Sequence, residues 1–318
     1  MRRFFQIIAT LGPASVDDAV LLSAAGATGF RLSASHFEAT RLQDTIARLR
    51  SVFPQTPLIV DLQGAKMRLG RFPAREVQRG ERVRFSLTPD PGGFPLPHPE
   101  LFQTVAPGDT LRVDDDRLQF QVQAVSAGRI ETVALGQGLL LPRKGVNLVE
   151  HPVNLEDLTE GDRALCQALA ALPSVAFAFS FMKDGAEAAW IRRIVPGAAV
   201  VGKVERREAT LNLSGLAAAV DALWICRGDL GAQLGPAELA GFVARLEPRS
   251  LGTPVLMAGQ VLEHLTEHPE PTRSEVCHLY DLVARGYAGI VLSDETAIGV
   301  DPVRAVRSAA SLIASFLG

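Results

Sequence analysis

Eight short and nearly continuous apolar runs limit what this chain can fold into more than any other feature. Strands that are buried on both faces carry such runs, because helices cover both sides of a parallel sheet. Helical patterns lie between the runs, so the chain reads as eight strand–helix units in order. The runs occupy residues 4–10, 28–33, 57–62, 175–182, 199–205, 222–227, 254–258 and 289–293. This order predicts an α/β fold, a closed (β/α)8 TIM barrel, and disfavours the alternative of an open doubly wound sheet.

The segment 71–142 departs from this pattern. It contains glycine, proline and short alternating strands at 82–87, 110–113, 118–125 and 129–135. We expect a small all-β domain inserted after strand three, with residues 1–70 and 143–318 forming the barrel. An insertion at the carboxyl end of a barrel strand lies over the barrel mouth, so we expect it to act as a lid that excludes water.

The charge and hydropathy of the chain exclude two kinds of partner. With 318 residues, a net charge of −3 and a pI near 6.1, it has no positive field for nucleic acid or an anionic membrane. No apolar run approaches the ~20 residues of a membrane span, and the N-terminus lacks a cleavable signal pattern. Cys166, Cys226 and Cys277 are scattered singly, which predicts packing residues in a reducing cytoplasm.

Side chains that could act in catalysis or metal binding lie at the end of the fifth apolar run and directly after the sixth. The fifth ends in Lys203 and Glu205, and Gly228 and Asp229 follow the sixth. Residues two apart on a strand point to the same face, so Lys203 and Glu205 should project together. Two carboxylates and a lysine at adjacent strand ends suit a divalent cation that carries an anionic substrate. Oxygen ligands favour magnesium or manganese over zinc. An ordinary buried ion pair is the alternative.

The ends of the first three runs add hydroxyl and cationic groups, at the edge where barrel enzymes do their chemistry. These ends read Thr10-Leu11-Gly12-Pro13, Arg31-Leu32-Ser33-Ala34-Ser35-His36 and Asp61-Leu62-Gln63-Gly64-Ala65-Lys66-Met67-Arg68. Arg31 and Arg68 could clamp a phosphate in a bidentate manner, and the alternative for each is a salt bridge to a neighbouring carboxylate. With Lys203, these groups suit electrostatic catalysis of phosphoryl transfer or enolate formation.

Eight segments in order resemble the pyruvate kinase family, from about Ile7 to the end of the chain. They are TLGPAS, RLSASH, DLQGAKMRLG, PRKGVNL, GKVERRE, CRGDLG, HPEPTRSE and LSDETAIG. The resemblance implies a barrel and a lid. It also implies a truncated member without the family's usual C-terminal domain, since the sequence stops at the eighth helix.

The resemblance implies roles residue by residue. The catalytic residues are Lys203, Arg31 and Arg68, and the ligands of Mg²⁺ or Mn²⁺ are Glu205 and Asp229. Substrate contacts are implied for Gly228, Asp229, Gly259, Ser33 and Lys66, and nucleotide contacts for Thr10, Pro13, His36 and Lys144. The family's monovalent-cation site corresponds to Ser33, Ser35, Asp61 and the Leu62 carbonyl. Lys66 stands where potassium-requiring members have glutamate, so the lysine would supply the positive charge and K⁺ would not be required.

Three departures from the family pattern fall on the nucleotide and proton-donor side. Gly259 replaces the threonine that takes part in protonating the enolate, Ile298 replaces a lysine near the nucleotide phosphates, and Arg41 replaces an aromatic residue. The resemblance implies a cytoplasmic, Mg²⁺-dependent transferase of glycolysis that passes a phosphoryl group from phosphoenolpyruvate to ADP through a metal-stabilised enolate.

Two other functions stay open. The first is a Mg²⁺-dependent lyase or aldolase acting on pyruvate, oxaloacetate or a related 2-oxo acid, which Gly259 and Ile298 favour. The second is a non-catalytic regulatory barrel. Whether identical chains assemble into a homo-oligomer is also open at this point.

Overall fold

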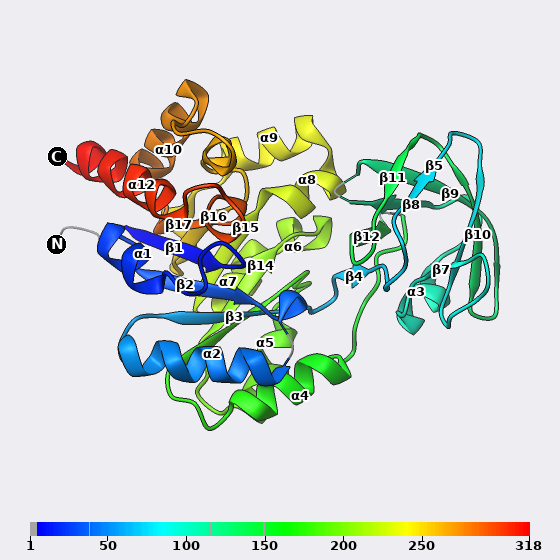
Figure 1. The fold of residues 1–318 in the computed structure, drawn as a ribbon, viewed down its shortest axis with the longest axis horizontal. Coiled ribbons are helices and arrows are strands. Elements are labelled where there is room, and N and C mark those ends of the chain that lie inside the picture. Colours follow the sequence, from blue (N-terminus) through cyan, green and yellow to red (C-terminus); the bar gives the residue numbers. More distant parts are fainter. Residues whose placement is uncertain (1–4, 38, 115, 149) are drawn as a thin grey trace. The chain divides into compact units, whose positions relative to one another are not determined.

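The computed structural model describes residues 5–37, 39–114, 116–148 and 150–318, which form two compact units (Figure 1). The first unit comprises Met1–Gly64, Asp157–Leu230 and Pro236–Gly318. The second comprises Ala65–Glu156 and Gly231–Gly235. Each unit has its own sheet and its own apolar core.

The first unit is the expected (β/α)8 barrel. Its eight parallel strands close in the order β1-β2-β3-β13-β14-β15-β16-β17, and β17 pairs with β1. The strands are β1 (Gln6–Leu11), β2 (Gly29–Ser33), β3 (Leu58–Leu62), β13 (Val175–Phe179), β14 (Val200–Val204), β15 (Ala222–Cys226), β16 (Val255–Ala258) and β17 (Gly289–Leu292). Each strand overlaps one of the eight apolar runs, so burial on both faces was read correctly from the sequence.

Helices surround this barrel (Figure 1). They are α1 (Ala19–Ala25), α2 (Ala39–Val52), α4 (Glu160–Leu169), α5 (Ala186–Ile194), α6 (Arg207–Leu211), α7 (Leu213–Ala219), α8 (Arg227–Leu234), α9 (Pro236–Arg245), α10 (Arg273–Arg285), α11 (Asp294–Ala297) and α12 (Pro302–Leu317). Short 3₁₀ turns are η1 (Ala34–His36), η2 (Pro248–Leu251) and η3 (Glu263–Thr266). Within the described ranges, no helix is long and apolar enough to cross a membrane.

Side chains fill the barrel interior, so its chemistry is confined to the mouth. The inward-facing set includes Trp224, which is 2% exposed and contacts residues from the other strands. The rest of this set is Ile8, Ile59, Ala178, Val201, Cys226, Leu256, Ala258 and Val291. Layers of this kind make the barrel a packed core rather than a pore.

The second unit is built on a seven-stranded sheet in the order β4-β12-β8-β9-β10-β6-β7, beside the two-stranded sheet β11-β5. The strands are β4 (Met67–Arg68), β5 (Arg75–Val77), β6 (Arg82–Ser86), β7 (Phe94–Pro95), β8 (Thr110–Val113), β9 (Leu118–Ser126), β10 (Arg129–Ala134), β11 (Gly138–Leu140) and β12 (Gly145–Leu148). One short helix, α3 (Pro99–Thr104), is added to the expected all-β content.

The bounds of the second unit differ from the expected insertion. Residues 71–142 lie inside it, but the unit begins earlier and ends later. The reason is that β4 and β12, just outside those limits, pair with each other at the edge of its sheet. An alternating pattern is hard to recognise in a two-residue strand such as β4, so the sequence did not show this pairing.

Candidate active site

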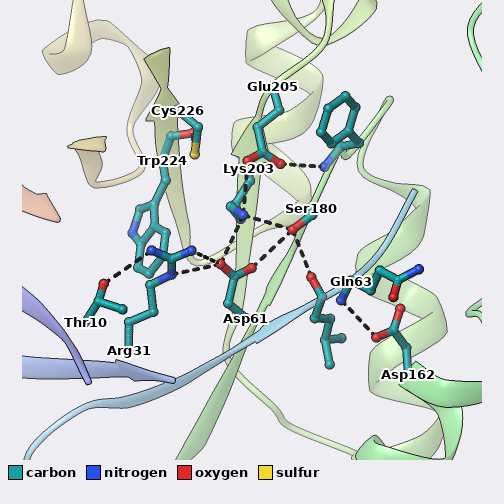
Figure 2. Close-up of polar contacts among 12 residues, drawn as sticks. Thr10, Arg31, Asp61, Gln63, Asp162, Ser180, Lys203, Glu205, Trp224 and Cys226 are labelled. Carbon is teal, nitrogen blue, oxygen red and sulfur yellow. Dashed lines mark hydrogen bonds and ion pairs between the residues drawn. The ribbon is translucent and has the colours of Figure 1, made fainter. Parts of the chain in front are cut away.

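Lys203 is the centre of a buried polar cluster at the carboxyl ends of the barrel strands (Figure 2). Its side chain comes from β14 and is only 7% exposed. The ammonium Nζ lies 3.0 Å from Asp61 Oδ2, 3.0 Å from Glu205 Oε1 and 2.9 Å from Ser180 Oγ. The pairing with Glu205 shows that these two residues share a face, as their spacing predicts.

The surroundings of Lys203 keep it positively charged. Burial disfavours the charged form of an amine, but the carboxylates of Asp61 and Glu205 outweigh burial and raise the pKa of Lys203 above its usual value. The side chain is therefore a fixed cation at neutral pH. A fixed charge at this place needs no reorganisation to stabilise a developing anion.

The carboxylate of Asp61, on β3, is surrounded by hydrogen-bond donors and cations. Its Oδ2 accepts from Arg31 Nε at 2.8 Å and lies 2.6 Å from Arg31 Nη2, and Ser180 Oγ lies 3.2 Å from its Oδ1. Burial alone would raise the pKa of Asp61, but Lys203 and Arg31 lower it to about 2. Arg31 also donates from Nη1 to Thr10 Oγ1 at 3.2 Å. The structure thus contains the salt bridge that was the alternative reading of Arg31.

Two carboxylates stand at neighbouring strand ends. Glu205 directly follows β14 and is 2% exposed, and its Oε2 accepts from the Phe181 amide at 2.8 Å. Asp229 lies in the first turn of α8, directly after β15, and is 8% exposed. Because β14 and β15 pair in parallel, with Lys203 opposite Trp224, these two acids belong to one edge of the barrel.

The acidic groups fit one kind of metal site. Among the described residues, no group of three or more His, Cys, Asp or Glu side chains is arranged to hold a metal ion. Mg²⁺ is usually bound by one or two carboxylates, with waters and substrate oxygens filling its remaining positions. Two buried carboxylates therefore suit Mg²⁺ or Mn²⁺ and do not suit a structural zinc site.

The end of β16 lies beside the start of α8. A Cβ atom added at Gly259 would lie 3.7 Å from the Gly228 amide nitrogen. Arg227 holds this turn, because its Nε and Nη2 donate to the Gly259 carbonyl at 3.1 and 2.9 Å. Gly259 has no side chain that could deliver a proton here, and it leaves room next to the Gly228 amide.

Sequence reasoning missed Ser180 and Thr296. Ser180 follows β13 and contacts Lys203, Asp61 and the Leu62 carbonyl, which accepts from its Oγ at 2.8 Å. The Oγ1 of Thr296 accepts from the Thr10 amide at 2.9 Å. The strand-end rule that singled out Asp61 would have found Ser180 if it had been applied to the fourth apolar run.

Cys226 was expected to be a packing residue, and it lies in the charged cluster (Figure 2). It ends β15, and its side chain faces the barrel interior beside Trp224. Burial, reinforced by the charge of Glu205, raises the pKa of the Cys226 thiol well above its usual value. The thiol therefore remains protonated and is not a reactive thiolate.

The remaining predicted residues are spread over both units. Pro13 is exposed, Ser33 and Ser35 are half-buried, and the side chain of His36 lies outside the described part of the chain. Lys66, Arg68 and Lys144 belong to the second unit. Lys144 Nζ pairs with Asp114 at 2.8 Å, and Arg68 Nη1 donates to the Arg143 carbonyl at 3.1 Å. The roles assigned to these residues stay predictions.

Comparison with known proteins shows to which family the chain belongs. The family model for the barrel domain of pyruvate kinase matches residues 2–306. The chain belongs to the pyruvate kinase family. Among its relatives, a pyruvate kinase of Methylorubrum extorquens is 33% identical over 95% of this chain and 66% of its own length. One from Geobacillus stearothermophilus is 31% identical over 97% of this chain and 56% of its own length, and one from Aeropyrum pernix is 29% identical over 96% and 69%.

The chain thus spans about two thirds of the length of the Methylorubrum extorquens relative and just over half of the length of the Geobacillus stearothermophilus relative. The match covers both compact units, because it runs through the segment that separates the third and fourth barrel strands. Family membership therefore agrees with the fold and with the strand-end position of the polar cluster.

Proposed function

We propose that this chain is a Mg²⁺-dependent phosphotransferase that moves the phosphoryl group of phosphoenolpyruvate to ADP. The observation that carries the proposal is the fixed ammonium of Lys203, 3.0 Å from Glu205, at the strand edge that also holds Asp229. Family membership supports it, since relatives named pyruvate kinase match nearly the whole of this chain in sequence. A cytoplasmic location belongs to the same proposal.

In this proposal the reaction breaks the phosphorus–oxygen bond of phosphoenolpyruvate and joins the phosphoryl group to ADP. The enolate of pyruvate is left, with negative charge shared between its oxygen and its methylene carbon, which then takes up a proton. Lys203 would stabilise the enolate oxygen, and Arg31 the phosphoryl oxygens. The backbone amides of Gly228 and Asp229, in the first turn of α8, would hold the substrate carboxylate.

Glu205 and Asp229 would hold the divalent cation. Bound there, the ion would supply Lewis-acid stabilisation of substrate oxygens. The protein's own part is to hold the carboxylates in place, and the Phe181 amide does this for Glu205.

The test is a coupled assay for pyruvate formation from phosphoenolpyruvate and ADP with Mg²⁺. We expect turnover that requires both ADP and the metal ion. Pyruvate that forms equally well without ADP would contradict phosphoryl transfer to a nucleotide.

A lyase or aldolase acting on a 2-oxo acid is the second candidate. Gly259 favours it, because it leaves space beside the Gly228 amide and provides no hydroxyl to protonate an enolate. Such an enzyme would use the same enolate stabilisation by Lys203. Metal-dependent decarboxylation or cleavage of oxaloacetate and related 2-oxo acids, at a rate that ADP does not change, would support this candidate over the first.

We predict that activity does not require K⁺. At the barrel mouth, Arg31 and Lys203 already neutralise Asp61, and the Leu62 carbonyl accepts a hydrogen bond from Ser180. Lys66 stands where potassium-requiring members have glutamate. Replacing K⁺ with tetramethylammonium should therefore leave kcat unchanged, whereas Lys66→Glu should lower kcat and make it rise with added K⁺. A wild-type rate that collapses without K⁺ would contradict this prediction.

A further inference from the structure

Arg227 is a half-buried cation that is held by carbonyl groups and an imidazole. Its Nε and Nη2 donate to the Gly259 carbonyl at 3.1 and 2.9 Å, and Nη2 also donates to the Gln260 carbonyl. Its Nη1 lies 2.9 Å from Nε2 of His278, which belongs to α10. Within the described ranges, no carboxylate forms an ion pair with this guanidinium. Since buried charges are usually paired, the histidine at this place needs an explanation.

The contact with Arg227 determines the protonation state of His278. Arginine has only N–H donors, so the ring nitrogen that it contacts must accept. His278 is therefore neutral, with its proton on Nδ1. Burial, and after it the charge of Arg227, lowers the pKa of His278 below its usual 6.5; Arg285 on the same helix acts in the same direction, and Asp281 opposes them. The acidic groups near Arg227 at longer range are Tyr287, Glu295, Glu263 and Glu275.

Arg227 holds a backbone turn that has an unfavourable conformation. This turn, which we call the β16 turn, consists of Gly259 and Gln260, with φ angles of +74° and +54°. The left-handed region is unfavourable for a residue with a Cβ atom such as Gln260, and the hydrogen bonds from Arg227 offset this cost. Arg227 is also the first residue of α8, whose first turn carries Gly228 and Asp229. One side chain thus ties the β16 turn to the start of α8.

We propose that His278 is a positioning residue for the reaction, because its neutral imidazole holds Arg227, which holds the β16 turn beside the first turn of α8. A proton on Nε2 would remove the acceptor and leave two cations 2.9 Å apart. Arg227 would then lose one of its anchors, and the substrate and the metal ion would bind less tightly. The inference rests on the proposed function for its effect on turnover, and it adds acid sensitivity set by a helix outside the barrel strands.

The test compares the dependence of kcat/KM on pH, from about pH 7.5 to about pH 5, for pyruvate formation by the wild type and by variants. We expect the wild type to lose about tenfold more kcat/KM over this range than His278→Gln, because glutamine keeps an acceptor that does not titrate. His278→Leu should lower kcat/KM about tenfold or more already at neutral pH, since a hydrogen bond to a charged group is lost. The matched control is His151→Gln, an exposed histidine of the second unit that pairs with Asp109, which should keep the wild-type profile.

Two further measurements do not depend on turnover. NMR titration of the His278 ring should give a pKa below 6.5. Calorimetry should show that Mn²⁺ binding weakens toward acid pH more in the wild type than in His278→Gln. If His278→Leu does not fold, His278→Gln and the ring titration decide.

Three results would overturn the proposal: a His278 pKa at or above 6.5, a loss in acid that is the same in His278→Gln as in the wild type, or an equal change in His151→Gln. Absence of turnover, with the ring titration and the Mn²⁺ binding as expected, would reject the proposed function and leave this inference standing.

Discussion

Replacing Lys203 with methionine is expected to lower kcat for pyruvate formation by at least ~10³, equivalent to about 4 kcal/mol of transition-state stabilisation. Methionine matches the length of the lysine stem and carries no charge. The enolate oxygen would then lose the one buried ammonium that Asp61 and Glu205 hold in place. Steady-state assays with phosphoenolpyruvate, ADP and Mg²⁺ give kcat and KM. We expect the loss mainly in kcat, because the interaction forms with charge that develops during the reaction.

Lys183→Met is the matched control for this variant. Lys183 is exposed, and its backbone amide donates to Glu187 Oε1 at 2.6 Å. The control should retain wild-type kcat. Circular dichroism and thermal unfolding of both variants separate lost chemistry from a lost fold. A Lys203→Met enzyme that stays folded and keeps more than about a tenth of the wild-type kcat would show that this ammonium does not stabilise the transition state.

The Lys203 variant is informative for either candidate reaction. A lyase acting on a 2-oxo acid would form the same kind of enolate and would lose activity to a similar extent. Exchange of the methyl protons of pyruvate with solvent, followed by NMR, reports enolate formation without ADP. This exchange should require the metal ion and should be lost in Lys203→Met.

The barrel was predictable because its signals are local. Strands such as β13 and β15 are continuous apolar runs of five residues, a length and composition typical of parallel strands covered on both faces. The common face of Lys203 and Glu205 followed from the two-residue period of a strand alone. Lys203, Glu205 and Asp229 could therefore be placed at one edge of the barrel before any contact was known.

The partners within the cluster were not predictable in this way. Lys203 contacts Asp61, which is 142 residues away in sequence, and Thr10 contacts Thr296, 286 residues away. Such contacts depend on how the barrel closes, and no short motif encodes them. Arg31 illustrates the difference: its position at a strand end was readable, whereas its choice of Asp61 as partner was not.

Replacing Asp61 with asparagine is expected to destabilise the protein by about 3 kcal/mol at pH 7, because buried Lys203 and partly buried Arg31 lose their shared counter-ion. Folding lowers the pKa of Asp61 from 3.8 to about 2, which corresponds to about 2 kcal/mol of stability from this ionisation. Because the folded pKa is the lower one, the unfolded chain binds more protons as pH falls. The stabilisation is therefore complete above about pH 5 and is lost as the pH falls toward 2.

Urea unfolding at several pH values measures this difference. The gap between wild type and Asp61→Asn should be widest near neutral pH and should narrow from pH 5 downward, since Asp61 of the unfolded wild-type chain takes up a proton there while folded Asp61 stays ionised. Asp17→Asn is the control, because Asp17 pairs with Arg48 at 2.9 Å on the surface, where ion pairs contribute little to stability. A gap that stays constant from pH 7 to pH 3, or one as small as that of the control, would show that the charge of Asp61 does not hold Arg31 and Lys203 in place.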